Sequence, residues 1–204
     1  LGFFEPLPLE LTEAKGAAPL LPPKWSDLSS MTISFGHGLS VSPVHLAAAF
    51  ATLAGGGARV RPTLIKGGAE PGEQVVSAET ARSMMQIIRE VVRRGTGRRT
   101  NLPGYEVGGK TGTADKPRPG GGYYRKRVIA TFASVFPTSN PRYALVISLD
   151  EPADRSGPVI KREASRTAVP VTAVAIGRIA PLLGLRPLPV SAPAGPAATE
   201  AGGQ

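Results

Sequence analysis

Gly108-Gly109-Lys110-Thr111-Gly112-Thr113 is the most informative stretch of this 204-residue chain, because it fits two unrelated kinds of site. Together with Gly104 it completes the G-x-x-x-x-G-K-T spacing of a phosphate-binding P-loop. A P-loop, however, opens directly into a helix whose N-terminal N–H groups hold the phosphates. Pro117 and the glycine at position 112 break any helical pattern after the lysine. The stretch therefore favours a strand, with a P-loop nucleotide hydrolase kept as an alternative.

An edge strand at this position suits a different chemistry. K-T-G strands border the serine acylation sites of penicillin-binding proteins and serine β-lactamases. In such a strand Gly112 would let a substrate backbone approach closely, because it has no side chain, and Lys110 would add positive charge. Thr111 and Thr113 would offer hydroxyl donors to a substrate carboxylate. Our candidate catalytic wall is therefore Lys110, Thr111, Gly112 and Thr113, and the candidate substrate-binding residues are Lys110, Thr111 and Thr113.

Several other strings, spread over roughly Leu1–Pro152, carry a family resemblance. They are Ser34–Pro43 (SFGHGLSVSP), Gly55–Gly57, Gly95–Gly97 (GTG), Gly108–Ala114, Gly120–Tyr124, Asn140–Ala144 (NPRYA) and Asp150–Pro152 (DEP). On these strings the chain resembles the class B penicillin-binding proteins of the cell-division type, the FtsI-like peptidoglycan D,D-transpeptidases. After Pro152 the sequence departs from the family, because the charged stretch Asp154–Thr167 replaces a glycine-rich strand and only Ala168–Val171 is similar again.

The resemblance implies the α+β fold of penicillin-binding transpeptidases and serine β-lactamases, in which helices flank both faces of an antiparallel sheet. Because the chain starts at Leu1 without an initiator Met, we expect a piece of a longer protein, with the N-terminal part of the domain missing. Residues 1–186 would form the C-terminal part of a transpeptidase domain. Residues 187–204, rich in Pro, Ala and Gly, would be a disordered tail.

Two catalytic motifs of the family do not occur in this sequence. The family places its acylating serine in S-x-x-K and completes the site with S-x-N, and neither string is found among the 204 residues. A positioned nucleophile with its base is what divides acyl transfer into two feasible steps. We therefore expect the chain to be part of a serine-type transpeptidase and to be inactive alone. A noncatalytic binding remnant of such a protein is the second alternative.

The resemblance also implies a substrate, partners and a cellular location. The full enzyme would form an acyl-enzyme with the D-Ala-D-Ala end of a peptidoglycan stem peptide and pass the acyl group to an amine on a neighbouring stem. β-Lactams would acylate the same serine as inhibitors, and no cofactor would be needed. Other division proteins are possible partners. The enzyme would work at the periplasmic face of the bacterial inner membrane, held by an anchor absent from this chain.

Composition argues against other classes of protein. The formal net charge is +9, but the basic residues are scattered and no helix-turn-helix, RNA-binding aromatic pattern or Cys/His finger is present, so no nucleic-acid partner is expected. The sequence has no Cys and therefore no disulfide or thiolate metal site. His37 and His45 lie too far apart for an H-E-x-x-H pair, and no metal is expected.

Local patterns predict the main elements. Ser42 and Pro43 begin a helix that Gly55 ends, and its Ala-rich composition suggests burial on most sides. Ser77 begins an amphipathic helix with apolar residues at i, i+3, i+4 and i+7. The remaining predicted elements are a short strand at Arg59–Lys66, a hairpin of Val128–Phe136 with Arg142–Asp150, and a final helix at about Val169–Leu183.

Overall fold

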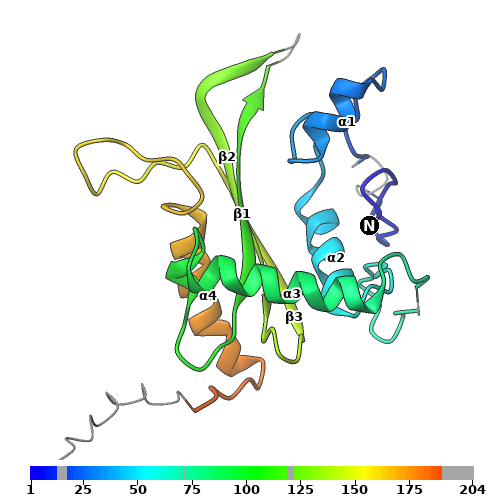
Figure 1. The fold of residues 1–204 in the computed structure, drawn as a ribbon, viewed down its shortest axis with the longest axis vertical. Helices are drawn as coiled ribbons and strands as arrows, with labels where there is room; N and C mark the ends of the chain where they lie inside the picture. The colour runs from blue at the N-terminus through cyan, green and yellow to red at the C-terminus, as the bar shows by residue number, and fades with distance from the viewer. Residues whose placement is uncertain (13–17, 71, 119–121, 190–204) are drawn as a thin grey trace, which may run out of the picture.

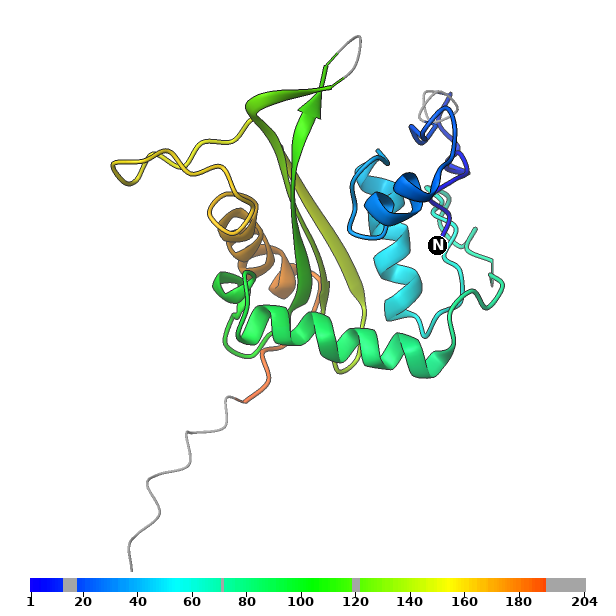
Figure 2. The same cartoon turned by 45° about the horizontal axis from the view of Figure 1, so that its top comes forward.

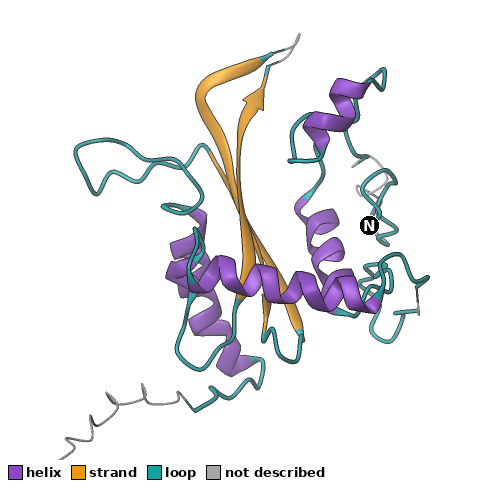
Figure 3. Ribbon diagram, in the orientation of Figure 1, coloured by secondary structure: helices purple, strands orange, loops and turns teal. Residues whose placement is uncertain are grey.

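The computed structural model describes residues 1–12, 18–70, 72–118 and 122–189. Its core is a three-stranded antiparallel sheet with strand order β1-β2-β3, packed against helices (Figures 1 and 3). The elements in chain order are α1 (Asp27–Ile33), α2 (Pro43–Ala54), α3 (Ala78–Arg93), the short 3-10 helix η2 (Arg98–Thr100), β1 (Gly108–Pro117), β2 (Tyr123–Phe136), β3 (Tyr143–Asp150) and α4 (Ala168–Leu182).

The central strand β2 has an apolar side chain on each face of the sheet, because successive residues of a strand point to opposite faces. Phe132 and Phe136 lie in one buried cluster with Val169 and Ile176 of α4. Val135 lies in a second cluster on the opposite face, with the α3 residues Met85 and Ile88 and, partly buried, Phe50 of α2. Figure 2 shows α4 on one side of the sheet and α2 on the other. The predicted α+β architecture, with helices on both faces, is confirmed.

Side-chain caps fix where the two central helices begin. The hydroxyl of Ser42 accepts a hydrogen bond from the backbone N–H of His45, and Ser77 does the same for Thr80. Both helices therefore begin at the predicted positions. The prediction that α2 is buried on most sides is wrong, because only His45, Ala49 and Thr52 are fully buried and the rest of the helix is half-buried or exposed.

One other prediction needs correction. Arg59–Lys66 forms no strand; the nearest pairing is an isolated bridge between Ala58 and Gln74, and Pro62 has no N–H to donate to a ladder. At the start of the predicted disordered tail, the N–H of Leu188 donates to the carbonyl of Gly104 at 2.9 Å. The rest of that predicted tail, 190–204, lies outside the described residues.

The helix predicted at the end of the domain is confirmed as α4. Its buried residues Ala168, Val169, Thr172, Ile176 and Ala180 repeat at three- and four-residue intervals, which gives one face toward the sheet. Of the helices in the described ranges, none has the length and apolar character needed to cross a bilayer.

The buried side chain of His45 connects the N-terminal segment to α2 by hydrogen bonds. His45 is only 2% exposed; its Nδ1 lies 2.9 Å from the Ser42 hydroxyl and its Nε2 lies 2.9 Å from the backbone carbonyl oxygen of Glu5. A neutral ring that donates from Nε2 and accepts at Nδ1 satisfies both contacts. The N-terminal segment is therefore part of the packed domain.

Replacing His45 by alanine is expected to lower the free energy of unfolding by about 2–4 kcal/mol, because it removes two buried hydrogen bonds and leaves a cavity. Urea-dependent pulse proteolysis of the full-length protein that carries this chain would measure the loss. The matched control is His37→Ala at the exposed histidine, which should cost no more than about 1 kcal/mol. Equal losses for the two variants would contradict the structural role given to the buried ring.

Candidate active site

All four candidate wall residues lie on β1, which pairs with β2 along one side and is an edge of the sheet. Lys110 lies opposite Ala133, and Gly112 lies opposite Thr131. A strand, not a helix, therefore runs through the lysine, which does not fit the P-loop interpretation. The prediction of an edge strand is confirmed.

The four residues divide between the two faces of the sheet. A side chain at Gly108 would meet Ile88 of α3, so even-numbered positions of β1 face α2 and α3. A side chain at Gly109 would meet Phe132, so odd-numbered positions face α4. Lys110 and Gly112 thus share one face, and Thr111 and Thr113 the other, and all four border the same edge.

Lys110 is exposed, and no carboxylate in the part of the chain that the structure describes neutralises its charge. Its Nζ donates to the backbone carbonyl of Thr111 at 2.7 Å, and none of the ion pairs formed among the described residues includes it. An ammonium group held beside a strand edge in this way is free to attract a ligand carboxylate.

Both threonine hydroxyls are held by segments beyond β1. The hydroxyls of Thr111 and Thr96 lie 2.8 Å apart, and the Thr113 hydroxyl accepts a hydrogen bond from the backbone N–H of Ala164 at 3.0 Å. The Thr113 hydroxyl keeps its own proton and can still donate to a ligand. The Gly95–Gly97 string gave no indication of a role for Thr96, because Thr96 and its partner Thr111 lie 15 residues apart in sequence.

The glycines of β1 differ in what surrounds them. A Cβ at Gly108 would lie 3.0 Å from the Ile88 side chain, and one at Gly109 would lie 2.6 Å from the carbonyl oxygen of Ala133. Packing within the chain therefore accounts for both. A Cβ at Gly112 would meet nothing within 4 Å, and the backbone there has no left-handed φ that would favour glycine. Nothing in the described chain requires glycine at this position.

The loop before α2 reaches the far end of the β1–β2 hairpin. The rings of His37 and Tyr123 are 4.9 Å apart, centroid to centroid, and tilted by 41°. This contact joins two of the strings quoted above, Ser34–Pro43 and Gly120–Tyr124, which lie more than 70 residues apart in sequence. The loop before α2 and the start of β2 are therefore in contact.

The hairpin is also tied to β3. The Nζ of Lys116 lies 2.8 Å from Asp150 and 3.0 Å from Glu151, at the end of β3. Hydrogen bonds to Asp150 and then Glu151 raise the pKa of Lys116 above its ordinary value. Asp150, predicted as an acid at the end of a strand, has this structural contact.

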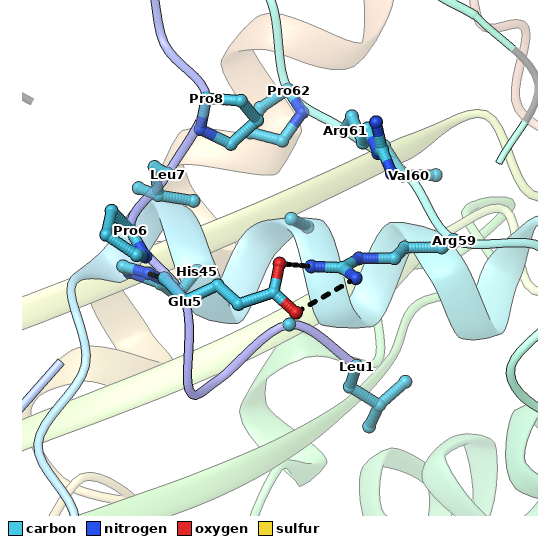
Figure 4. A pocket seen from close by; sticks show the side chains of 12 residues that line it. Leu1, Glu5, Pro6, Leu7, Pro8, His45, Arg59, Val60, Arg61 and Pro62 are labelled. Carbon is cyan, nitrogen blue, oxygen red and sulfur yellow. Dashed lines mark hydrogen bonds and ion pairs between the residues drawn. The ribbon is translucent and has the colours of Figure 1, made fainter. Parts of the chain in front are cut away.

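Two pockets of the domain lie away from the wall. One of about 190 Å³, shown in Figure 4, lies between the N-terminal segment and α2, where Arg59 forms an ion pair with Glu5 at 2.7 Å. The hydrogen bond and charge of this guanidinium hold the pKa of Glu5 below its ordinary value. The other, of about 410 Å³, lies between α2, α3 and the turn at Thr138 and Ser139. Neither pocket is lined by the K-T-G-T residues.

Comparison with known proteins places this geometry in a family. Residues 1–171 match the penicillin binding protein transpeptidase domain. The chain belongs to this family.

Named relatives agree with that assignment. The probable peptidoglycan D,D-transpeptidase FtsI of Caulobacter vibrioides is 38% identical over 198 residues, which cover 91% of this chain and 33% of that protein. The peptidoglycan D,D-transpeptidase FtsI of Escherichia coli is 36% identical over 137 residues, 63% of this chain and 22% of that protein. The chain thus spans about a third or less of the length of these relatives.

Solved structures support the same conclusion. The transpeptidase domain of Burkholderia pseudomallei penicillin-binding protein 3 superposes with a TM-score of 0.77 at 32% identity, covering 92% of this chain and 56% of that one. Penicillin binding protein 3 from Mycobacterium tuberculosis, complexed with ampicillin, gives 0.71 at 31% identity, covering 86% and 43%. The family resemblance and the fold predicted from the sequence are confirmed.

Proposed function

We propose that this chain supplies the K-T-G-T wall of the acyl-transfer site of a peptidoglycan D,D-transpeptidase that acts in cell division. The observation that carries the proposal is Gly112, a glycine on the free edge of β1 for which the described chain gives no packing or backbone reason. An unexplained glycine on an exposed strand edge suits a ligand backbone that must approach closely.

The wall residues have separate tasks in the proposed reaction. The ammonium of Lys110 attracts the terminal carboxylate of a D-Ala-D-Ala stem, and the hydroxyls of Thr111 and Thr113 donate to that carboxylate. The serine of an S-x-x-K motif outside this chain attacks the penultimate carbonyl and forms an ester, and the terminal D-Ala leaves. An amine of a second stem then attacks the ester, which forms the crosslink and releases the serine.

The same site would take β-lactams as inhibitors. Related structures were solved with ampicillin and with aztreonam, which supports the proposal for this chain. Placement at the periplasmic face of the inner membrane, through an anchor outside this chain, and contact with other division proteins belong to the same proposal. Residues 1–186 would be the C-terminal part of the transpeptidase domain.

The proposal predicts where penicillin attaches. Full-length protein incubated with a fluorescent penicillin should carry one covalent adduct, on the serine of an S-x-x-K motif outside Leu1–Gln204. Digestion and mass spectrometry of the labelled protein would map it. An adduct on a serine within this chain would contradict the proposal that the nucleophile lies outside it. A folded protein that takes up no label would favour a noncatalytic binding role.

A further inference from the structure

The far part of the β1–β2 hairpin stands clear of the rest of the sheet. The end of β3, Asp150, lies opposite Ile129, and Tyr123 at the start of β2 lies opposite Pro117 of β1, so Tyr123–Arg127 have no backbone partner on β3. Figures 1 and 2 show this two-stranded part rising beyond β3 on the same side as α1. Its described side chains are therefore open to a ligand.

This part of the hairpin is strongly cationic. From Asp115 to Arg127 the sequence holds five Lys and Arg residues against one acidic residue. Two of the five lie near carboxylates: Lys116 binds Asp150 and Glu151, and the Nε of Arg127 lies 3.8 Å from Glu151. The other three form no ion pair with any residue in the described ranges, and they are Arg118, Arg125 and Lys126.

The cations are gathered around one aromatic ring. The guanidinium carbons of Arg118 and Arg127 lie 5.3 Å and 4.9 Å from the ring centre of Tyr124. Cation–π attraction places both guanidiniums there, although two like charges on one ring repel each other. Lys126 lies between the arginines in a left-handed conformation, with φ of 64°, which is uncommon for lysine and redirects the strand. An anion bound among these groups would relieve the repulsion.

The cluster lies on the same strand as the proposed catalytic wall. Arg118 follows Gly112 by six residues, which is about 20 Å of extended strand. A peptide whose terminal carboxylate lies at Lys110, and which continues along the edge of β1, would therefore bring the residues that precede its D-Ala-D-Ala end beside the cluster. Between Asp115 and Arg127 the sequence has no Leu, Ile, Val, Met, Phe or Trp, the residues that anchor a surface in lipid. The composition favours a soluble anion over a bilayer.

We propose that Arg118, Arg125 and Lys126, arranged around Tyr124, form a subsite for the carboxylates of a cell-wall peptide bound along β1. The subsite rests on the proposed transpeptidase function and extends it, because it gives the enzyme a preference for substrates whose carboxylates are free and not amidated. It binds and positions the peptide and touches none of the reacting atoms.

The test compares two substrates on one variant of the full-length protein. Arg118→Gln, Arg125→Gln and Lys126→Asn together remove the three charges, and asparagine tolerates the left-handed backbone at the last position. For a stem peptide with free carboxylates the KM of crosslinking should rise about tenfold, because several exposed charge contacts are lost. For the same peptide with its other carboxylates amidated and its terminal D-Ala carboxylate left free, the KM of the variant should equal that of the wild type, and kcat should be unchanged for both substrates.

A matched control removes three exposed cations elsewhere, with Arg82→Gln, Arg178→Gln and Arg186→Gln, and should leave both KM values unchanged. Penicillin labelling tests the proposed catalytic site separately from the subsite, because we expect a small β-lactam not to reach the hairpin. A wild-type protein that takes up no label would refute the proposed function itself. If labelling is normal, three results overturn the subsite. They are an unchanged KM for the free carboxylates, equal rises for both substrates, and loss of binding to anionic phospholipid vesicles with no change in KM.

Discussion

Replacing Gly112 by valine is expected to abolish most penicillin acylation and to leave the domain folded. The new side chain would meet no atom of the described chain, and valine favours a strand more than glycine does. It would, however, occupy the space beside the edge of β1 where we place the ligand. We expect the acylation rate to fall by about 100-fold or more, because a ligand displaced by about 1 Å loses that much.

The control for this substitution lies three residues earlier on the same strand. Gly109→Ala adds a smaller side chain, but its Cβ would lie 2.5 Å from the ring of Phe132 and 2.6 Å from the carbonyl oxygen of Ala133. This variant should lose about 1–3 kcal/mol of folding free energy through overpacking. Rates of fluorescent penicillin labelling and thermal melts of the full-length proteins would separate the two effects. Normal labelling of the Gly112 variant would remove the main support for the proposed site.

Replacing Lys110 by alanine should lower the acylation rate by about 100- to 1,000-fold, the usual cost of removing one electrostatic contact from such a site. The lysine is exposed, and among the described residues its side chain bonds only to a carbonyl of its own strand, so folding should be unaffected. Lys110→Arg keeps the charge and should retain part of the rate, although the guanidinium does not reproduce the compact ammonium.

The matched control for the lysine is Lys66→Ala, at an exposed lysine in the turn that the hydrogen bond from Gly68 to Ile65 closes. It removes the same charge and should label like the wild type. Second-order rate constants measured at several salt concentrations would complete the comparison. A Lys110→Ala protein that labels within a factor of about two of the control would mean that this ammonium group is not part of the site.

Much of the fold was predictable because its signals are local. The hydroxyls of Ser42 and Ser77 cap N–H groups three residues later in the chain, and apolar runs rich in Val, Ile, Phe and Tyr mark β2 and β3. The error at Arg59–Lys66 has a different origin, since a strand needs a partner and local composition does not show whether one exists. The same holds for the small-residue helix α2, whose composition gave no indication of how much of its surface the rest of the chain would cover.

The geometry of the candidate site was predictable in part. The edge strand that carries the K-T-G-T residues was predicted from the sequence, because glycine and proline exclude a helix there. The role of those residues stays a prediction. The contacts that hold the site were missed: Thr96 with Thr111, Ala164 with Thr113, and His37 with Tyr123. Each joins segments that only the folded chain brings together, and no residue pattern in the sequence specifies such a pair.

Gly108 and Gly109, the packed glycines at the start of β1, also determine how β1 can align with β2. If β1 slipped by one residue in one direction, Lys110 would lie opposite Ser134 and point its charge at Phe132 in the core. A slip the other way would drive Val107 against Ile88 of α3. Since a one-residue slip reverses the face of every side chain, these glycines exclude the misaligned sheets in which threonine and lysine exchange sides. Packing in the core thereby fixes the orientation of the proposed catalytic wall, whether or not a ligand is bound.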